Sequence, residues 1–221
     1  MTGHVVLLGD SIFDNQAYTA GEPAVLDHLQ ALLPRQWRAS LHAVDGARIF
    51  DLPRQLSQVP ASATRLVIAI GGNDALSNMD LLATPVPSTA AALSLFERRA
   101  SQFEAEYRAA VARTLRLRKP LTLCTIYNGN LDAAQARLAR IALMIFNDAI
   151  LRVAFENAAD VIDLRLVCSE PSDYANPIEP SGSGGRKIAL SIVTALQLEE
   201  GATTASRVLG AVSGSSHPNG E

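Results

Sequence analysis

Short apolar segments alternate with longer segments of helical periodicity along most of the chain. The short segments are rich in Val, Ile and Leu and are apolar at consecutive positions, which is typical of strands in a parallel sheet covered by helices on both faces. The pattern therefore predicts an α/β fold. The expected strands are residues 5–8, 39–44, 66–70, 121–126 and 161–163.

Four longer segments have the spacing of amphipathic helices. In one of them apolar side chains recur every three or four positions, among them Phe96 and Phe103, so this stripe is expected to face the sheet. Asp132 is a suitable N-cap for another helix, whose mostly apolar face includes Leu138 and Ile141. The predicted helices are residues 24–33, 93–117, 132–155 and 185–197.

Length and composition favour one globular domain. The chain has 221 residues, of which 48% are hydrophobic and 19% charged, and this is enough to bury a sizeable core. We expect one domain over residues 1–200. Residues 201–221 are rich in Gly, Ser and Thr and poor in apolar side chains, so they are expected to form a mobile tail.

The charge pattern and the cysteines exclude several classes of protein. A formal net charge of -3 without runs of like charge argues against a nucleic-acid partner. Apolar runs are strand-sized, which predicts no membrane span, and the start of the chain lacks a cationic leader, which predicts a cytoplasmic protein. Cys124 and Cys168 have neither metal-ligand spacing nor a disulfide framework.

Polar turns follow the first three predicted strands. The first strand leads into Gly9, Asp10 and Ser11, the second is followed by Gly46, and the third leads into a Gly-Gly-Asn-Asp turn that contains Asn73. Parallel strands end at the same edge of a sheet, where open α/β folds place their sites. Ser11 is a candidate nucleophile there, and the Asn73 amide and the Gly46 N–H are candidate donors to an oxyanion. Each turn taken alone is also compatible with ordinary loop structure.

Together, the turns at residues 9–11, 46 and 71–74 resemble the first three sequence blocks of the SGNH hydrolases, also called GDSL esterases and lipases. The resemblance extends over residues 5–198. It implies a flavodoxin-like, three-layer α/β/α sandwich with a parallel sheet of about five strands. It also implies an ester hydrolase without a cofactor, in which Ser11 is the nucleophile and the N–H of Ser11, Gly46 and Asn73 form the oxyanion hole.

The fourth block departs from the family pattern of Asp-x-x-His shortly before the last helix. Alignment on Pro180 and Ser181 places Glu179 at the position of the histidine and Asn176 at that of the aspartate. None of the four histidines lies where a base is expected: His4, His28, His42 and His217.

Glu179 is therefore the candidate base. Burial would raise the pKa of its carboxyl group and increase its basicity, whereas a hydrogen bond donated by Asn176 would act in the opposite direction. In the alternative interpretation, Glu179 is a solvated loop carboxylate and Asn176 a turn former.

Three functions remain open. The first is a serine esterase, lipase or thioesterase that acts on a small-molecule ester. The second is a catalytically weak or inactive protein of the same fold that binds an acylated or glycosylated ligand. The third is a nucleotide or phosphate binder, which the lack of a Gly-x-Gly-x-x-Gly turn after the first strand disfavours.

Overall fold

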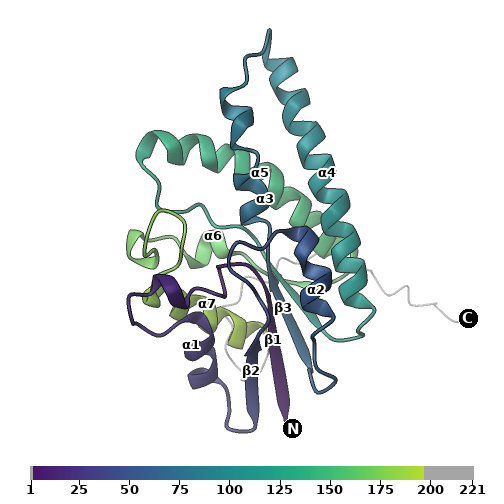
Figure 1. Ribbon diagram of the computed structural model, residues 1–221, viewed down its shortest axis with the longest axis vertical. Coiled ribbons are helices and arrows are strands. Elements are labelled where there is room, and N and C mark those ends of the chain that lie inside the picture. The colour runs from purple at the N-terminus through teal and green to yellow at the C-terminus, as the bar shows by residue number, and fades with distance from the viewer. Residues whose placement is uncertain (1, 197–221) are drawn as a thin grey trace, which may run out of the picture.

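The computed structural model describes residues 2–196 and contains a parallel sheet of five strands, in the order β2-β1-β3-β4-β5. This order is that of the flavodoxin-like doubly wound folds, so the predicted α/β class is confirmed (Figure 1). The chain reverses its direction of travel across the sheet between β1 and β3, and ligands of such folds bind at this point. The strands are β1 (Gly3–Gly9), β2 (Trp37–Leu41), β3 (Arg65–Ala69), β4 (Leu121–Cys124) and β5 (Asp160–Ile162).

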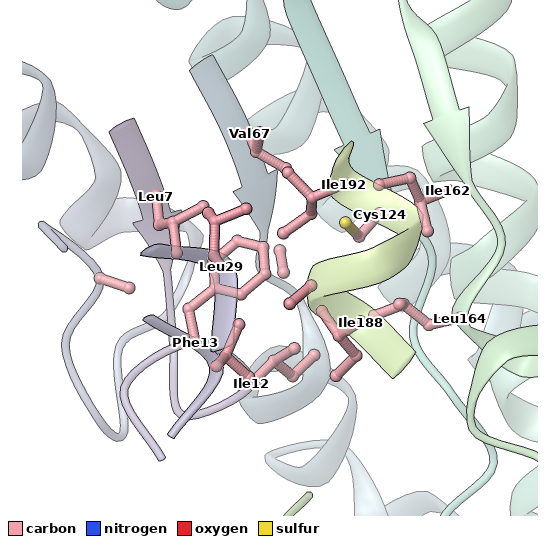
Figure 2. Close-up of a cluster of buried hydrophobic side chains, with 14 of the residues drawn as sticks. Leu7, Ile12, Phe13, Leu29, Val67, Cys124, Ile162, Leu164, Ile188 and Ile192 are labelled. Carbon is pink, nitrogen blue, oxygen red and sulfur yellow. The ribbon is translucent and has the colours of Figure 1, made fainter. Parts of the chain in front are cut away.

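Helices cover both faces of the sheet and give the three layers that were predicted. Successive residues of β1 point to opposite faces, so that Val5 and Leu7 belong to one apolar cluster and Val6 and Leu8 to the other. Figure 2 shows the first cluster, packed between the sheet and the helices α1 and α7. The helices of this face are α1 (Val25–Leu32), α6 (Leu164–Val167) and α7 (Gly182–Ala195), and those of the other are α2 (Leu52–Leu56), α4 (Thr89–Leu115) and α5 (Ala133–Glu156).

Two predicted strands end at least two residues earlier than expected. The second was expected to reach residue 44, but β2 ends at Leu41, because the N–H groups of His42 and Ala43 both donate to the carbonyl of Leu7 and turn the chain out of the ladder. The fourth was expected to reach residue 126. It ends at Cys124, and the N–H of Ile126 donates instead to a side chain of α5.

The long helices α4 and α5 extend past the sheet (Figure 1). With 27 residues, α4 is about 40 Å long, whereas the longest strand, with 7 residues, spans about 23 Å. Phe103 is buried in the apolar cluster on the sheet, but Phe96, one part of the predicted stripe, is only half-buried and belongs to neither apolar cluster. The predicted apolar face of α5 is wrong in its first half, since Leu138 is 56% and Ile141 63% exposed.

Short elements that the sequence pattern did not predict connect the layers. They are α2 and α6, α3 (Gly72–Leu76) and four 3₁₀ helices, namely η1 (Gln16–Tyr18), η2 (Ile49–Asp51), η3 (Met79–Ala83) and η4 (Pro171–Asp173). Asp132 is the predicted N-cap of α5, and its carboxylate accepts hydrogen bonds from two N–H groups of the first turn. The predicted mobile tail and His217 lie outside the described residues. Within residues 2–196, every helix is too short or too polar to cross a membrane.

Candidate active site

Ser11 lies on a turn directly after β1. Gly9 has a φ of 133°, and a Cβ atom there would come within 1.7 Å of the carbonyl oxygen of Ala69, so the turn requires glycine. The N–H of Asp10 donates to that same carbonyl at 3.1 Å, and the Asp10 carboxylate accepts from the N–H of Ile12. These contacts hold the Ser11 side chain at the carboxyl edge of the sheet, where it is 7% exposed.

The Ser11 hydroxyl contacts a carboxylate that is distant in sequence. Its Oγ donates a hydrogen bond to Oε1 of Glu179 at 3.1 Å, and Glu179 is 6% exposed. Burial raises the pKa of the Glu179 carboxyl group, the hydrogen bond from Ser11 opposes this shift, and the negative charge of Asp45 adds to it. Oε2 is buried and has no hydrogen-bond partner among residues 2–196. The serine is therefore paired with a carboxylate of increased basicity.

The loop that carries Glu179 is fixed by its own hydrogen bonds. Oδ1 of Asn176 accepts from the N–H groups of Ile178 and Glu179, each at 2.9 Å, and the N–H of Ala175 donates to the carbonyl of Glu179. The hydrogen bond that Asn176 was expected to donate to the Glu179 carboxylate is not formed within the described chain. Asn176 instead holds the backbone on which that carboxylate is mounted.

Two neighbouring side chains hold the same loop from outside. The hydroxyl of Tyr127 donates to the carbonyl of Ile178 at 2.6 Å. Nδ2 of the fully buried Asn15 donates to the carbonyl of Pro180 at 3.2 Å, and its Oδ1 accepts from the N–H of Val25 at the start of α1. The loop of Glu179 is thus held by a frame of hydrogen bonds with Asn176, Tyr127 and Asn15.

Asn73 stands at the start of α3, on the turn after β3. Its Nδ2 donates to the carbonyl of Ala47 at 3.0 Å, which leaves its second amide hydrogen available. The neighbouring Asp74 is buried and accepts from the N–H of Ile49 at 3.1 Å and from Arg48 at 3.5 Å. The turns that follow β2 and β3 are in this way tied to each other.

Gly46 lies on the turn tied to Asn73. It adopts a φ of 75°, which favours glycine, and it is exposed. Within residues 2–196, neither its N–H nor that of Ser11 donates to another group of the protein. Both are therefore available to a ligand.

One cavity brings most of the candidate residues together. Ser11, Asn73 and Glu179 all line a cavity of about 370 Å³ at the carboxyl edge of the sheet. Gly46 and Asn176 are not among its lining residues; the first lies on the adjoining turn and the second behind the loop of Glu179.

Asp10 is a second buried carboxyl group beside the nucleophile. It is 1% exposed, and burial raises its pKa to about 8. The hydrogen bond from the N–H of Ile12 opposes this shift, whereas the negative charges of Glu179 and Asp74 add to it. Asp10 therefore keeps most of its proton at neutral pH. It supports the turn, and Glu179 is the carboxylate that contacts the serine.

None of the histidines in the described part of the chain forms a hydrogen bond with the Ser11 hydroxyl. His4 lies at the amino end of β1, where its ring contacts the hydroxyls of Ser40 at 2.8 Å and Ser62 at 3.2 Å. At about 3.3 Å per residue this is roughly 17 Å along the strand from the turn of Ser11. His28 lies on α1 and His42 just after β2, and neither forms a hydrogen bond with the Ser11 hydroxyl.

The sequence did not predict the apolar wall of the cavity. It comes from α3, from η3, from the first half of α4, from the segment that follows β4 and from α5 up to Phe146. The signal for this wall in the sequence was the set of apolar side chains at the start of α4 and α5, and these side chains were interpreted as part of the core. Large apolar side chains line this wall, among them Leu76, Met79, Leu82, Phe96, Leu138 and Phe146.

Comparison with known families identifies the family of this chain. Residues 7–186 match the GDSL-like lipase/acylhydrolase family, and the chain belongs to this family. A comparison with curated proteins finds no match.

Several solved structures are similar. A variant of an acetyl-xylooligosaccharide esterase from Geobacillus is 19% identical, covers 89% of this chain and 95% of its own, and has a TM-score of 0.63. The phospholipase A1 of Streptomyces albidoflavus is 17% identical over 87% of this chain and 99% of its own, with a TM-score of 0.64. An extracellular lipase of Streptomyces rimosus is 17% identical over the same shares, with a TM-score of 0.60. At these identities the likeness is one of fold.

Other expectations stay predictions. The fold does not test a cytoplasmic location, the lack of a nucleic-acid partner or the lack of a cofactor. Within the part of the chain that the structure describes, no three His, Cys, Asp or Glu side chains are grouped so as to hold a metal ion. Both cysteines are free and buried, and burial raises their pKa values, so these thiols are unreactive.

Proposed function

We propose that the protein is a serine hydrolase of carboxylic esters that uses a glutamate as its general base. Ser11 is the nucleophile and Glu179 the base. The second amide hydrogen of Asn73 and the N–H groups of Ser11 and Gly46 form the oxyanion hole. The observation that carries the proposal is the hydrogen bond of 3.1 Å from the Ser11 hydroxyl to the buried Glu179 carboxylate.

In the first half of the reaction, Oγ of Ser11 attacks the carbonyl carbon of the ester. The hydroxyl proton passes to Oε1 of Glu179, and the carbonyl oxygen takes up the negative charge, which the oxyanion donors stabilise. When the intermediate collapses, the bond to the alcohol oxygen breaks and Glu179 returns the proton to it. The alcohol leaves, and the acyl group remains on Ser11.

In the second half, a water molecule takes the place of the alcohol. Glu179 accepts a proton from the water as it attacks the acyl carbon, and the same donors stabilise the second oxyanion. Collapse breaks the bond to Oγ of Ser11, which regains its proton from Glu179. The carboxylic acid is released and the site returns to its starting state.

The surroundings of Glu179 suit a carboxylate for this role. A general base works best when its pKa is near the operating pH, and an ordinary glutamate is too weak a base at neutral pH. Burial and the charge of Asp45 raise the pKa of Glu179 and so reduce this disadvantage. The frame of Asn176, Tyr127 and Asn15 replaces the aspartate that orients the base in the family pattern.

Active-site labelling tests the nucleophile. A fluorophosphonate probe is expected to label the wild type, and p-nitrophenyl esters are expected to be hydrolysed, whereas Ser11→Ala abolishes both. Ser57→Ala is the matched control, since Ser57 is exposed and its hydroxyl donates to the carbonyl of Arg54, away from the cavity. Equal labelling of wild type and Ser11→Ala would contradict the assignment of the nucleophile.

The variant Glu179→His separates an enzyme from a binding protein of the same fold. If the wild type hydrolyses esters and Glu179→Ala loses most of that activity, the carboxylate is the base. If the wild type is inert and Glu179→His gains a burst of ester hydrolysis, the native chain is a binder for an acylated or glycosylated ligand, and the proposal is wrong.

A further inference from the structure

The cavity beside Ser11 is much larger than an acetyl group requires. Its volume is about 370 Å³, and its lining is mostly carbon, with Ile126, Tyr127 and Phe146 as buried residues of the wall. At about 30 Å³ for a group of the size of a water molecule, it has room for about a dozen non-hydrogen atoms. Ser11 and Glu179 line the same space.

The rim of the cavity is also apolar. Leu76 is 40% exposed, and Met79, Leu82 and Leu138 are exposed as well, although all four line the cavity. These side chains lie on α3, η3 and α5. The projecting half of α4 lies beside η3, because Arg99 of α4 forms an ion pair with Asp80 of η3 at 3.5 Å. Apolar side chains gathered around an open cavity indicate a site that an apolar ligand covers.

The neighbourhood of Glu179 outside the cavity lining is polar, and Asp45 there is exposed to solvent. The hydroxyl of Tyr18 donates to Oδ2 of the exposed Asp45 at 2.6 Å, and the N–H of Asp45 donates to Asp14. Asp45 is near enough to Glu179 for its charge to act on that carboxylate. In the proposed mechanism the alcohol leaves and water enters beside this base, so both need a wet path. This polar neighbourhood provides that path, and the apolar cavity is left for the acyl chain.

We propose that the cavity binds the acyl chain of the substrate, and that esters of unbranched carboxylic acids with about eight carbons are preferred over acetate esters. This inference rests on the proposed function. Each methylene that leaves water for the cavity is expected to raise kcat/KM about fourfold, the equivalent of about 0.8 kcal/mol. The increase should level off once the chain reaches the exposed rim.

Two substrate series distinguish the acyl part from the alcohol part. With p-nitrophenol as the constant alcohol, kcat/KM is expected to increase on the order of a hundredfold from butanoate to octanoate. With acetate as the constant acid, alkyl esters from ethyl to octyl are expected to show little dependence on chain length. A flat first series overturns the inference, and a dependence confined to the second series overturns the assignment of the chain to the acyl part.

Filling the cavity tests its location. Ala142 lines the cavity from α5, and Ala142→Phe is expected to lower the ratio of octanoate to butanoate hydrolysis at least tenfold. Ala139→Phe, one turn earlier, is a second variant in case the first fails to fold. Arg140→Phe is the control, because Arg140 is exposed on the same helix and does not line the cavity. An unchanged ratio in both alanine variants contradicts the inference.

Binding of octanoate separates this inference from the proposed function. Octanoate is expected to raise the melting temperature of wild type and of Ser11→Ala, but not that of Ala142→Phe. If octanoate stabilises the protein and no ester is hydrolysed, the acyl site stands and the proposed hydrolase is wrong. If esters are hydrolysed without a preference for chain length and octanoate has no effect, the hydrolase stands and the acyl site is wrong.

Discussion

Replacing Glu179 with glutamine keeps the size of the side chain and removes its ability to accept a proton. The oxygen that receives the hydrogen bond from Ser11, at 3.1 Å, can still be present in Glu179→Gln, so the serine stays in place. What is lost is the general base, whose contribution is typically 10² to 10⁴ in rate. We expect kcat/KM to fall by about this factor, which corresponds to about 3 to 5 kcal/mol. The oxyanion donors are expected to sustain the residual activity.

The same assignment predicts the direction in which kcat/KM changes with pH. Only the ionised carboxylate of Glu179 can accept the proton of Ser11, so wild-type kcat/KM should increase with pH and level off above the pKa of this group. Burial, aided by the charge of Asp45, raises that pKa above its ordinary value, and the hydrogen bond from Ser11 offsets only a part. The increase should therefore extend to higher pH than it would for an ordinary glutamate, whose pKa is about 4.3. Glu179→Gln should lack this increase of kcat/KM with pH.

The assay is the hydrolysis of a p-nitrophenyl ester from about pH 4 to about pH 8, followed at a wavelength where p-nitrophenol and its anion absorb equally. Glu170→Gln is the control, because Glu170 is an exposed carboxylate of the preceding segment. Equal values of kcat/KM for wild type and Glu179→Gln over the whole range would refute the reasoning.

Three further predictions concern neighbouring groups. Asn73→Ala should lower kcat about 10²- to 10³-fold through the loss of an oxyanion donor, measured with a substrate at saturation. Asp45→Asn should move the rise in kcat/KM to lower pH, because it removes a negative charge that raises the pKa of Glu179; a shift in the opposite direction would contradict this, and salt should reduce the effect. The pKa of Asp10 is about 8 in the folded protein and lower when unfolded, so the folded chain holds a proton that the unfolded chain loses. The free energy of unfolding should therefore fall from about pH 4 to about pH 8, by at most about 1.4 kcal/mol per pH unit, and denaturation of Asp10→Asn should lack this component.

The turns of the site could be predicted because each follows a strand that is easy to recognise. Parallel pairing sets Gly9 of β1 opposite Ala69 of β3, so the residues that come next meet at one edge whatever the details of their loops. The sequence also indicated the four longer covering helices, α1, α4, α5 and α7, from their periodicity. These features depend on local pattern and on the general topology of α/β folds.

Features that depend on distant contacts could not be predicted. The oxygen of Asn176 holds two backbone N–H groups, and its sequence position alone suggested a contact with the carboxylate. The apolar residues Leu138 and Phe96 fit a helical stripe equally well whether they face a sheet or a cavity. Which of the two they face depends on where the helix projects past the strands, and periodicity carries no information about this.

The projecting halves of α4 and α5 have a consequence for how this protein can change. Their cavity-facing residues are largely outside the two apolar clusters of the core, so exchanging one for another costs little folding free energy. The turn of Ser11 is different, because Gly9 has no room for a side chain. A lineage can therefore change which molecules the cavity accepts by mutating the wall that α4 and α5 form, while the turn of Ser11 in the same cavity stays unchanged.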